Sequence, residues 1–506
     1  MGNQPTDEKI FTTKLIAFAS ILVLASCEKK LDLYPYDSIE LSQSFQTIKD
    51  ATTWNNGLYA DFRGRVYGSY NISQDVQADQ LNATLDFGNR NGNPHRWGSS
   101  FLADDGALSG SWAGYYGALR NVNMTIAGYE KIKTNSAAEL ATLTKCKGDA
   151  YLARAYYYSE LILRFAKPYE PATASTDLGV PLVLEYDVTA RPARSTIKQV
   201  YDQILVDIGK AKTNLATTPG LAGSTKFNID VAVALEARVL LYMQDWAGAM
   251  AAANTLITAN KYPLLNSVAN LDRMWTNDLA TEVIYNAAVV KQTEPANTNS
   301  IYLGFNGATN KFVPDFIPTV NFVNLYAATD FRRQVYLKQV PVIIQGVDFP
   351  NMWVVNKFPG NPALFTGTFT NYQHSPKVFR SAEQLLIYAE AANRLGGAND
   401  ALALTALNRL RVARGLSALT GVSGATLTTE IRNERTRELA FEGFRLFDLK
   451  RWRLGFTRGT TQNLGAINVG SNYNTISIAA DNPQFVWGIP TYEININTNL
   501  VQNKGW

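Results

Sequence analysis

The sequence predicts a mainly α-helical fold of paired helices that carries a loop-rich, partly β insertion. Residues 231–262 and 383–415 each place small or apolar residues every three or four positions, which is typical of two amphipathic helices joined by a short turn. Residues 271–380 lie between these pairs, are richer in Gly, Pro and Asn, and contain strand-like fragments such as VPVII at 340–344. The length of 506 residues would permit two or three domains, but we predict a single domain over residues 27–506.

The chain begins with the pattern of a bacterial lipoprotein signal. An apolar run at 15–26 is shorter than the roughly 20 residues that cross a bilayer; lysines precede it, and it ends in small residues directly before Cys27. This order predicts a signal peptide over residues 1–26. The letters LASC resemble the lipobox, in which the cysteine is acylated, so we predict lipidation of Cys27. An ordinary signal peptide beside a buried cysteine is the alternative.

The N-terminal third combines a tether, loops and two helices. Residues 31–50 are predicted as a tether that leads into the fold, and residues 71–111 as long loops, because Gly, Asn and Asp are frequent there. Residues 147–165 repeat apolar and aromatic residues with helical spacing. A second helix is expected over 195–215, with Ser195 as its N-cap, and prolines separate the two helices.

The two helix pairs place alanines where neighbouring helices must approach closely. Ala249 and Ala253 mark the second helix of the first pair, and Ala403 and Ala406 mark that of the second pair. Each pair is close to the roughly 34 residues of a tetratricopeptide hairpin. Any α-helical protein can contain alanine-rich hairpins, so periodicity alone leaves tetratricopeptide-like packing as one of two interpretations. The pairs are far apart in the chain, which argues against a simple solenoid.

Residues 434–452 (ERTRELAFEGFRLFDLKRW) predict a helix with one charged face. Arg435, Glu438, Glu442 and Arg445 follow one another at offsets of three, four and three, which places opposite charges within reach of each other. Three phenylalanines supply the buried side. From the residues alone, this segment is a salt-bridged amphipathic helix with a structural role.

The same segment strongly resembles the hallmark of the SusD/RagB family of bacterial outer-membrane lipoproteins. The resemblance extends over nearly the whole chain: it includes the lipobox, LDLYPYDS at 31–38, GDAYLARAYYYSELILRFAKPY, STIKQVYDQILVDI, SAEQLLIYAEAANRLG, LNRLRVARGL and the final WGIPTYEININTNLVQNKGW. It implies a SusD-like fold on the outer membrane, lipid-anchored and displayed at the cell surface. It also implies that the protein captures oligosaccharides and delivers them to a partner SusC-like TonB-dependent transporter. The alternative within the family is a peptide-binding RagB-like lipoprotein.

Composition and motifs exclude several other classes. A formal net charge of +4 with 18% charged residues and no basic tract gives no footprint for nucleic acid. Cys146, in a helical pattern, is predicted as a small, inert residue with no disulfide partner. No metal site and no cofactor are predicted, because His95 and His374 stand outside any ligand spacing.

An enzyme is a less favoured interpretation. A glycosidase needs two carboxylates opposed across the scissile bond. Asp104 and Asp105 are adjacent in sequence and would point in different directions, and the pair Asp75 and Asp79 has a spacing that is common by chance. The familiar hydrolase and nucleotide-binding motifs are missing from the sequence. A purely structural tetratricopeptide scaffold would explain the helices but not the aromatics in the loops.

Aromatic and planar polar residues in loops are the candidates for ligand binding, because sugar C–H faces stack on rings and hydroxyls bind to planar polar groups. A first cluster surrounds Trp97, which we expect to be an exposed stacking platform, and a second lies at 300–312. The predicted ligand-binding residues are Asp79, Arg90, Asn93, His95, Trp97, Tyr302 and Phe305. The alternative for each aromatic is a place in the core.

Overall fold

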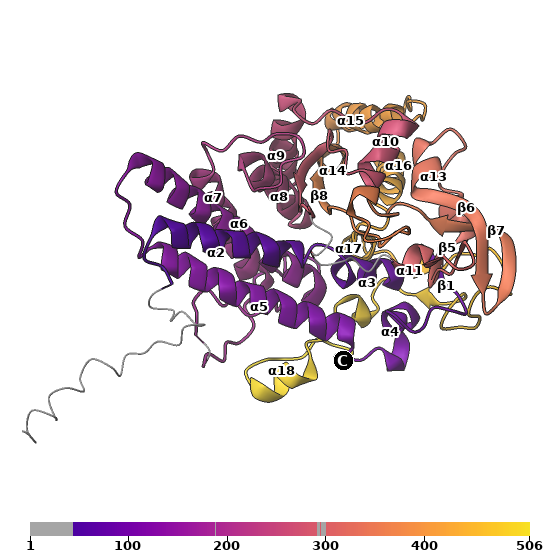
Figure 1. Ribbon diagram of the computed structural model, residues 1–506, viewed down its shortest axis with the longest axis horizontal. Helices are drawn as coiled ribbons and strands as arrows, with labels where there is room; N and C mark the ends of the chain where they lie inside the picture. The colour runs from indigo at the N-terminus through magenta and orange to yellow at the C-terminus, as the bar shows by residue number, and fades with distance from the viewer. Residues whose placement is uncertain (1–43, 188, 291–293, 295–299) are drawn as a thin grey trace, which may run out of the picture.

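The structure is a computed structural model that describes residues 44–187, 189–290, 294 and 300–506 (Figure 1). The predicted signal peptide and Cys27 lie outside these residues, so lipidation stays a prediction. Across the described ranges, no helix has both the length and the apolar character needed to cross a membrane.

Long helices form a stack that fills one end of the molecule and continues along its upper side, and most of the strands gather at the other end (Figure 1). The core of the stack is one large apolar cluster that includes Tyr157, Leu161 and Leu235, together with a smaller cluster around Leu407 and Leu427. Its helices are α2 (Ile48–Arg63), α5 (Gly106–Tyr129), α6 (Ala137–Phe165), α7 (Ile197–Asn214), α8 (Ile229–Tyr242), α9 (Trp246–Ala259), α14 (Ser381–Leu395), α15 (Asn399–Ala413) and α16 (Gly424–Glu438).

Both predicted helix pairs are present, as α8 with α9 and α14 with α15. Although the two pairs are far apart in sequence, α9 packs against α14, so they adjoin in one continuous helical layer. The alanines predicted at the close approaches, Ala249, Ala253, Ala403 and Ala406, are all buried. The interpretation as paired, closely packed helices is therefore confirmed, and the intervening segment is an insertion into the layer.

The insertion contains most of the strands, in small sheets. The four-stranded sheet has the order β3-β4-β6-β7, with β6 and β7 forming a long antiparallel hairpin, while β1 pairs with β5 and β2 with β8. The predicted strand at 340–344 is confirmed as the end of β6. The strands are β1 (Leu81–Ala83), β2 (Val283–Asn286), β3 (Phe305–Asn306), β4 (Lys311–Phe312), β5 (Phe316–Pro318), β6 (Leu337–Ile344), β7 (Val347–Val355), β8 (Lys377–Arg380), β9 (Phe456–Thr457) and β10 (Ser477–Ile478).

Short helices connect these strands to the stack. Residues 71–111, expected as long loops, contain most of α3, strand β1, α4 and the first turn of α5. Helix α3 forms there because buried apolar residues such as Ile72 and Val76 recur at helical spacing within the polar stretch. The short helices are α3 (Ser69–Gln77), α4 (Gly92–Arg96), α10 (Val268–Thr276), α11 (Ser300–Leu303), α12 (Val320–Val323), α13 (Phe331–Tyr336), α17 (Arg445–Arg451) and α18 (Thr491–Ile496), with 3₁₀ turns η2 (Gly98–Ser100), η3 (Pro362–Leu364) and η4 (Pro483–Phe485).

Two boundaries differ from the sequence prediction. Helix α7 is capped by Thr196, whose side chain accepts from the N–H of Gln199 while the Gln199 side chain accepts from the cap N–H; Ser195 is one residue too early. The helix expected over 434–452 is broken, because α16 ends at Glu438 and α17 begins at Arg445. Between them Phe441 and Gly443 have φ of 63° and 83°, which a continuous helix cannot contain.

Candidate functional site

Two residues predicted at the ligand site lie in the protein interior. Trp97 is 3% exposed, its Nε1 donates to the Gln77 carbonyl at 2.8 Å, and its ring packs 5.1 Å from that of Phe485. His95 is fully buried, with Nδ1 2.8 Å from the Val76 carbonyl. Burial lowers the pKa of His95 well below its usual range, so the ring is neutral and Nδ1–H donates to that carbonyl. The expectation of an exposed stacking platform at Trp97 is wrong, because its side chain is buried in an apolar cluster with Leu446 and Phe485.

Tyr302 and Asp79 are also committed to internal contacts. Tyr302 is 1% exposed and packs against Phe441 with ring centroids 5.6 Å apart. Asp79 accepts two hydrogen bonds from Arg445, at 2.8 and 2.7 Å. Burial raises the pKa of Asp79, but the charge and hydrogen bonds of Arg445, with a smaller contribution from Arg458, together hold it below its usual range. Tyr302 is therefore too buried to contact a ligand. Asp79 could contact one only while it remains paired with Arg445.

Arg90 brings the two predicted clusters together. Its side chain is 51% exposed and forms a two-point ion pair with Asp315, at 2.7 and 2.6 Å. A third donor, Nη1, reaches Ser300 Oγ at 3.1 Å, at the start of α11. These hydrogen bonds raise the pKa of Arg90, so the guanidinium is charged and fixes the 87–97 segment against the segment that leads into β3.

An asparagine-rich depression of about 330 Å³ lies beside Arg90 along the chain. Asn89 and Asn91 adopt the left-handed conformation, with φ of 60° and 54°, which asparagine tolerates better than most residues. Asn93 Nδ2 donates to Asp105 Oδ2 at 3.0 Å, which joins this segment to the N-terminus of α5. The lining residues are Ser69, Asn89, Asn91, Gly92, Asn93, Asp105, Gly106 and Ala107. Of the seven residues predicted to bind ligand, Asn93 is therefore the one that lines this depression.

An exposed aromatic group surrounds Phe305. The Phe305 ring is 5.2 Å from that of Phe312 and 5.4 Å from that of Phe369, and Phe369 is 52% exposed. Gly307 lies beneath the Phe369 ring: a Cβ at this position would come within 2.3 Å of it. Phe369 was missed from the sequence, although an aromatic residue in the Gly- and Thr-rich stretch TGTFTN was a signal of the same kind as the others.

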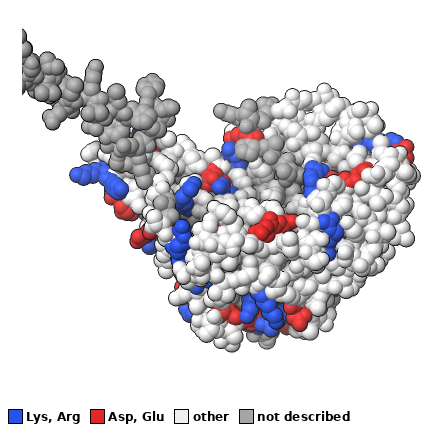
Figure 2. Space-filling model, turned by 90° about the horizontal axis from the view of Figure 1, so that it is seen from below, with Lys and Arg blue, Asp and Glu red and all other residues white. Residues whose placement is uncertain are grey.

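We define the loop face as the asparagine-rich depression together with Phe305 and Phe369. Arg90 ties the asparagine segment to Ser300 and Asp315, which flank the Phe305 hairpin, and the loop face combines amide donors and acceptors with a partly exposed aromatic surface. Charged side chains elsewhere are dispersed: the face in Figure 2 shows Lys, Arg, Asp and Glu in small mixed groups separated by uncharged surface. In the described ranges, no group of three His, Cys, Asp or Glu residues is arranged to hold a metal ion.

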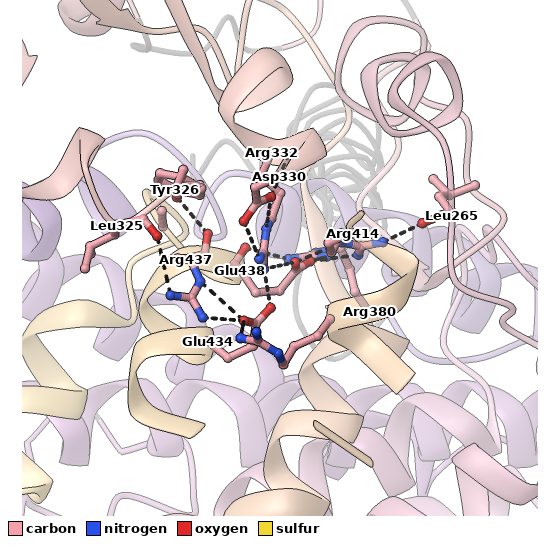
Figure 3. A network of polar contacts seen from close by, with 12 residues as sticks. Leu265, Leu325, Tyr326, Asp330, Arg332, Arg380, Arg414, Glu434, Arg437 and Glu438 are labelled. Atoms are coloured by element: carbon pink, nitrogen blue, oxygen red, sulfur yellow. Dashed lines mark hydrogen bonds and ion pairs between the residues drawn. The ribbon is translucent and has the colours of Figure 1, made fainter. Parts of the chain in front are cut away.

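The charged C-terminal segment, residues 434–452, takes part in a buried network of ion pairs and hydrogen bonds (Figure 3). Glu438 accepts hydrogen bonds from three arginines, Arg332, Arg380 and Arg414, at 2.8–3.0 Å. All four side chains are no more than 1% exposed. Arg332 lies on α13, Arg380 ends β8 and Arg414 follows α15, so one carboxylate fastens the insertion to the helical layer.

The pairing within this network differs from the sequence prediction. Arg435, Glu438, Glu442 and Arg445 are paired with residues elsewhere in the chain and not with one another. Glu442 accepts from Lys357 and Arg380, Arg435 donates to Asp448, and Arg445 donates to Asp79. The break between α16 and α17 separates their side chains, which explains the difference. The structural role predicted for Glu438 and Glu442 agrees with their burial.

Comparison with known families assigns the chain. The model of the "SusD family" matches residues 344–506, and the model described as "Starch-binding associating with outer membrane" matches residues 31–241. Together they include the helices of the stack other than α9, the Arg90 segment and the charged C-terminal segment with Glu438. The chain belongs to the SusD family. The resemblance stated from the sequence motifs is thereby confirmed.

Relatives within the SusD family align along almost the whole chain. SusD-like protein P38 of Formosa agariphila is 24% identical over 522 residues, which covers 91% of this chain and 94% of that protein. The structure of a SusD superfamily protein from Bacteroides thetaiotaomicron has a TM-score of 0.75 and 25% identity, and covers 90% of this chain and 99% of that one. A SusD-like carbohydrate binding protein from Bacteroides vulgatus has a TM-score of 0.71 and 20% identity, over 90% and 98% of the two chains. The mainly α-helical, SusD-like fold is the fold of these neighbours.

Proposed function

We propose that this SusD-family chain is a lipoprotein of the outer membrane that binds oligosaccharides at the cell surface on its loop face. It hands the bound oligosaccharide to a SusC-like TonB-dependent transporter. The anchor is Cys27, acylated after removal of residues 1–26. The description of the matching family model as starch-binding and outer-membrane-associated supports the ligand class and the location.

The loop face is the observation that carries the proposal. A sugar ring needs a flat apolar surface for its C–H face and planar polar groups for its hydroxyls. Phe369 and Phe305 supply the first, and Asn93 with its neighbouring asparagines supplies the second. Arg90 holds the two parts in place through Asp315 and Ser300, so little ordering is needed on binding.

A binding role is better supported than hydrolysis by the contacts of the carboxylates considered earlier. Asp105 caps α5 and accepts from Asn93, while Asp104 accepts from the Thr491 N–H. Asp75 is fully buried, and Asp79 lies beyond the end of α3, so they do not share a helix face. Each of these carboxylates has a structural partner. A peptide ligand, as in a RagB-like protein, would bind to the same amide-rich surface. Titration with both oligosaccharides and peptides distinguishes these two ligand classes.

The test is a calorimetric titration of the mature protein with a panel of oligosaccharides and peptides, repeated for Phe369→Ala. Loss of one stacking ring is expected to weaken the best oligosaccharide about tenfold, by analogy with bases stacked on aromatic side chains. Because Phe369 is 52% exposed, the melting temperature should change little.

Tyr492→Ala is the matched control, since Tyr492 is an aromatic residue 69% exposed on α18. It should bind like the unsubstituted protein. Equal affinity of Phe369→Ala and the control would move the site away from the loop face. Binding of peptides alone would replace the oligosaccharide by the peptide alternative.

A further inference from the structure

A second cavity, of about 390 Å³, opens between α16, α12 and the segment after α17. None of the residues that define the loop face lines it. Its polar walls come from three distant parts of the chain: Asp79 and Gln80, then Thr319 and Asn321, then the 429–459 region. Phe322, Leu325, Trp452 and Leu454 supply apolar surface. This mixture of apolar surface with a few convergent polar groups is typical of a small-ligand site.

Helix α16 presents its polar face to this cavity. Thr429, Arg432, Asn433 and Thr436 all line it, and their offsets of three, four and seven place them on one side of the helix. The other side of α16 carries Ile431 and Glu434, which are buried in the core. One side of the helix thus packs in the core, and the other presents polar side chains to a cavity large enough for a sugar residue.

Arg432 is a cation without an anion. Among the described residues, its side chain makes no direct ion pair or hydrogen bond and its Nε is buried without an acceptor, while the nearby carboxylate of Glu390 is paired with Arg451. The guanidinium carbon lies over the Trp452 ring, 5.1 Å from the centroid. Trp452 is itself fixed, because its Nε1 donates to Glu390 at 2.9 Å. A cation held on an aromatic ring keeps its N–H donors available for a ligand.

The other charges on the wall cancel. Asp79, the carboxylate of this wall, is engaged at both oxygens by Arg445, whose third donor reaches Thr436 Oγ1 at 2.9 Å. Arg432 therefore leaves the cavity with one uncompensated positive charge. Such a charge costs free energy when it is partly removed from water, and an anionic ligand would offset that cost.

Gln80 provides a second unsatisfied group. Its side chain lines the cavity, is 2% exposed, and has neither Nε2 nor Oε1 paired within the described part of the chain. A buried amide without partners is expensive, and such groups call for an explanation by a ligand or a function. An amide offers both a donor and an acceptor, which matches a sugar hydroxyl.

We propose that this cavity is a second binding site, for an acidic sugar residue whose carboxylate pairs with Arg432 and whose hydroxyls contact Gln80. The planar guanidinium matches a planar carboxylate through two parallel N–H···O bonds. The sugar part of the proposal rests on the glycan-binding function proposed above; the carboxylate part rests on the cavity alone.

The experiment is a ligand-observed NMR titration of the mature protein with D-glucuronate, and with D-glucose as its neutral counterpart. Glucuronate should bind about tenfold more tightly than glucose, because a charge-assisted pair is worth more than a neutral hydrogen bond. Arg432→Gln should abolish this preference. Arg333→Gln is the matched control, since the Arg333 guanidinium also lies over a tryptophan ring, 5.3 Å from that of Trp353, and outside the cavity.

Several outcomes would overturn the proposal. These are equal binding of the two sugars, no binding of glucuronate, and an unchanged preference in Arg432→Gln. If Arg432→Gln fails to fold, Arg432→Lys keeps the charge but loses the two-point geometry, so the preference should fall severalfold; an unchanged preference in that variant is equally adverse. Gln80→Leu should weaken both sugars without lowering the melting temperature, because it removes an unpaired buried amide.

The two proposals fail separately. Phe369→Ala should leave glucuronate binding unchanged, because Phe369 does not line the cavity. Glucuronate binding that depends on Arg432, in a protein whose loop face binds no oligosaccharide, would remove the proposed function and leave the cavity site standing. Oligosaccharide binding that depends on Phe369, without a preference for glucuronate over glucose, would support the proposed function and overturn the cavity site.

Discussion

The helical stack and the junction with the insertion differ in how their buried charges are arranged. In the stack, charges pair one to one, as exposed Lys198 does with Asp202 four residues away and buried Arg238 does with Glu383 across 145 positions. At the junction, Arg332 reaches Glu438 across 106 positions, and Arg414 reaches Glu282 across 132. The stack therefore combines local contacts with separate one-to-one ion pairs, whereas at the junction three arginines converge on one carboxylate, Glu438, an arrangement that no local pattern reveals.

The backbone shows the same contrast. Positive φ outside glycine is frequent in the loop segments, at Asn89, Asn91, Trp97 and Tyr372 among others. Such conformations cost free energy and persist where surrounding contacts fix them. In the loop face these contacts are side-chain bonds such as that from Arg90 to Asp315. The loop face is thus held by specific contacts and not by helical propensity.

The largest effect is expected at Glu438. Glu438→Gln keeps the volume but leaves Arg332, Arg380 and Arg414 around a neutral amide, and breaking a buried ion pair costs about 3–5 kcal/mol. Denaturant unfolding should show this loss. Asp202→Asn is the control: Asp202 belongs to an exposed pair, and such pairs contribute about 1 kcal/mol or less. Similar losses in the two variants would contradict the contrast between junction and stack.

The loss at Glu438 should depend on pH. Burial raises the pKa of Glu438, but the charges of Arg414 and Arg380 hold it well below its usual range. A carboxyl group whose pKa is lower in the folded state stabilises the fold above its unfolded pKa of 4.5, and this stabilisation is lost as pH falls below that value. The difference in unfolding free energy between the protein and Glu438→Gln should therefore be full near pH 7 and shrink in acid.

A smaller but still large effect is expected at Trp97. Trp97→Ala should lower the free energy of unfolding by about 3 kcal/mol, because it opens a cavity beside Phe485 and leaves the Gln77 carbonyl unpaired. Trp97→Phe should lose less. Oligosaccharide affinity, measured on folded protein, should be unchanged in Trp97→Phe. A loss of affinity with unaltered stability would return Trp97 to the binding site.

The sequence predicted the fold well and the site only in part, and the residues show why. Periodicity identified both helix pairs, because burial on one helix face leaves a local pattern. It could not show that α9 packs against α14, or that Glu438 pairs with Arg414, since these depend on contacts made only in the folded chain. Trp97 and His95 were placed at the surface because their neighbours are polar. Those neighbours form turns around a small core, and composition does not distinguish such turns from open loops.

The smallest effect concerns one boundary in the stack. Thr196→Ala removes the side-chain oxygen that accepts from the Gln199 N–H, and loss of such an N-cap costs about 1 kcal/mol. Ser195→Ala should cost a few tenths at most, because its side chain does not cap the helix. Denaturant unfolding of these two variants, which differ by one position, measures how much the N-cap hydrogen bond alone contributes to the free energy of unfolding. Thr196→Ala should also be insensitive to acid, in contrast to Glu438→Gln, because it changes no titratable group. A loss at Thr196 as large as that at Glu438 would show that one local contact in the stack contributes as much stability as the converging charges at the junction.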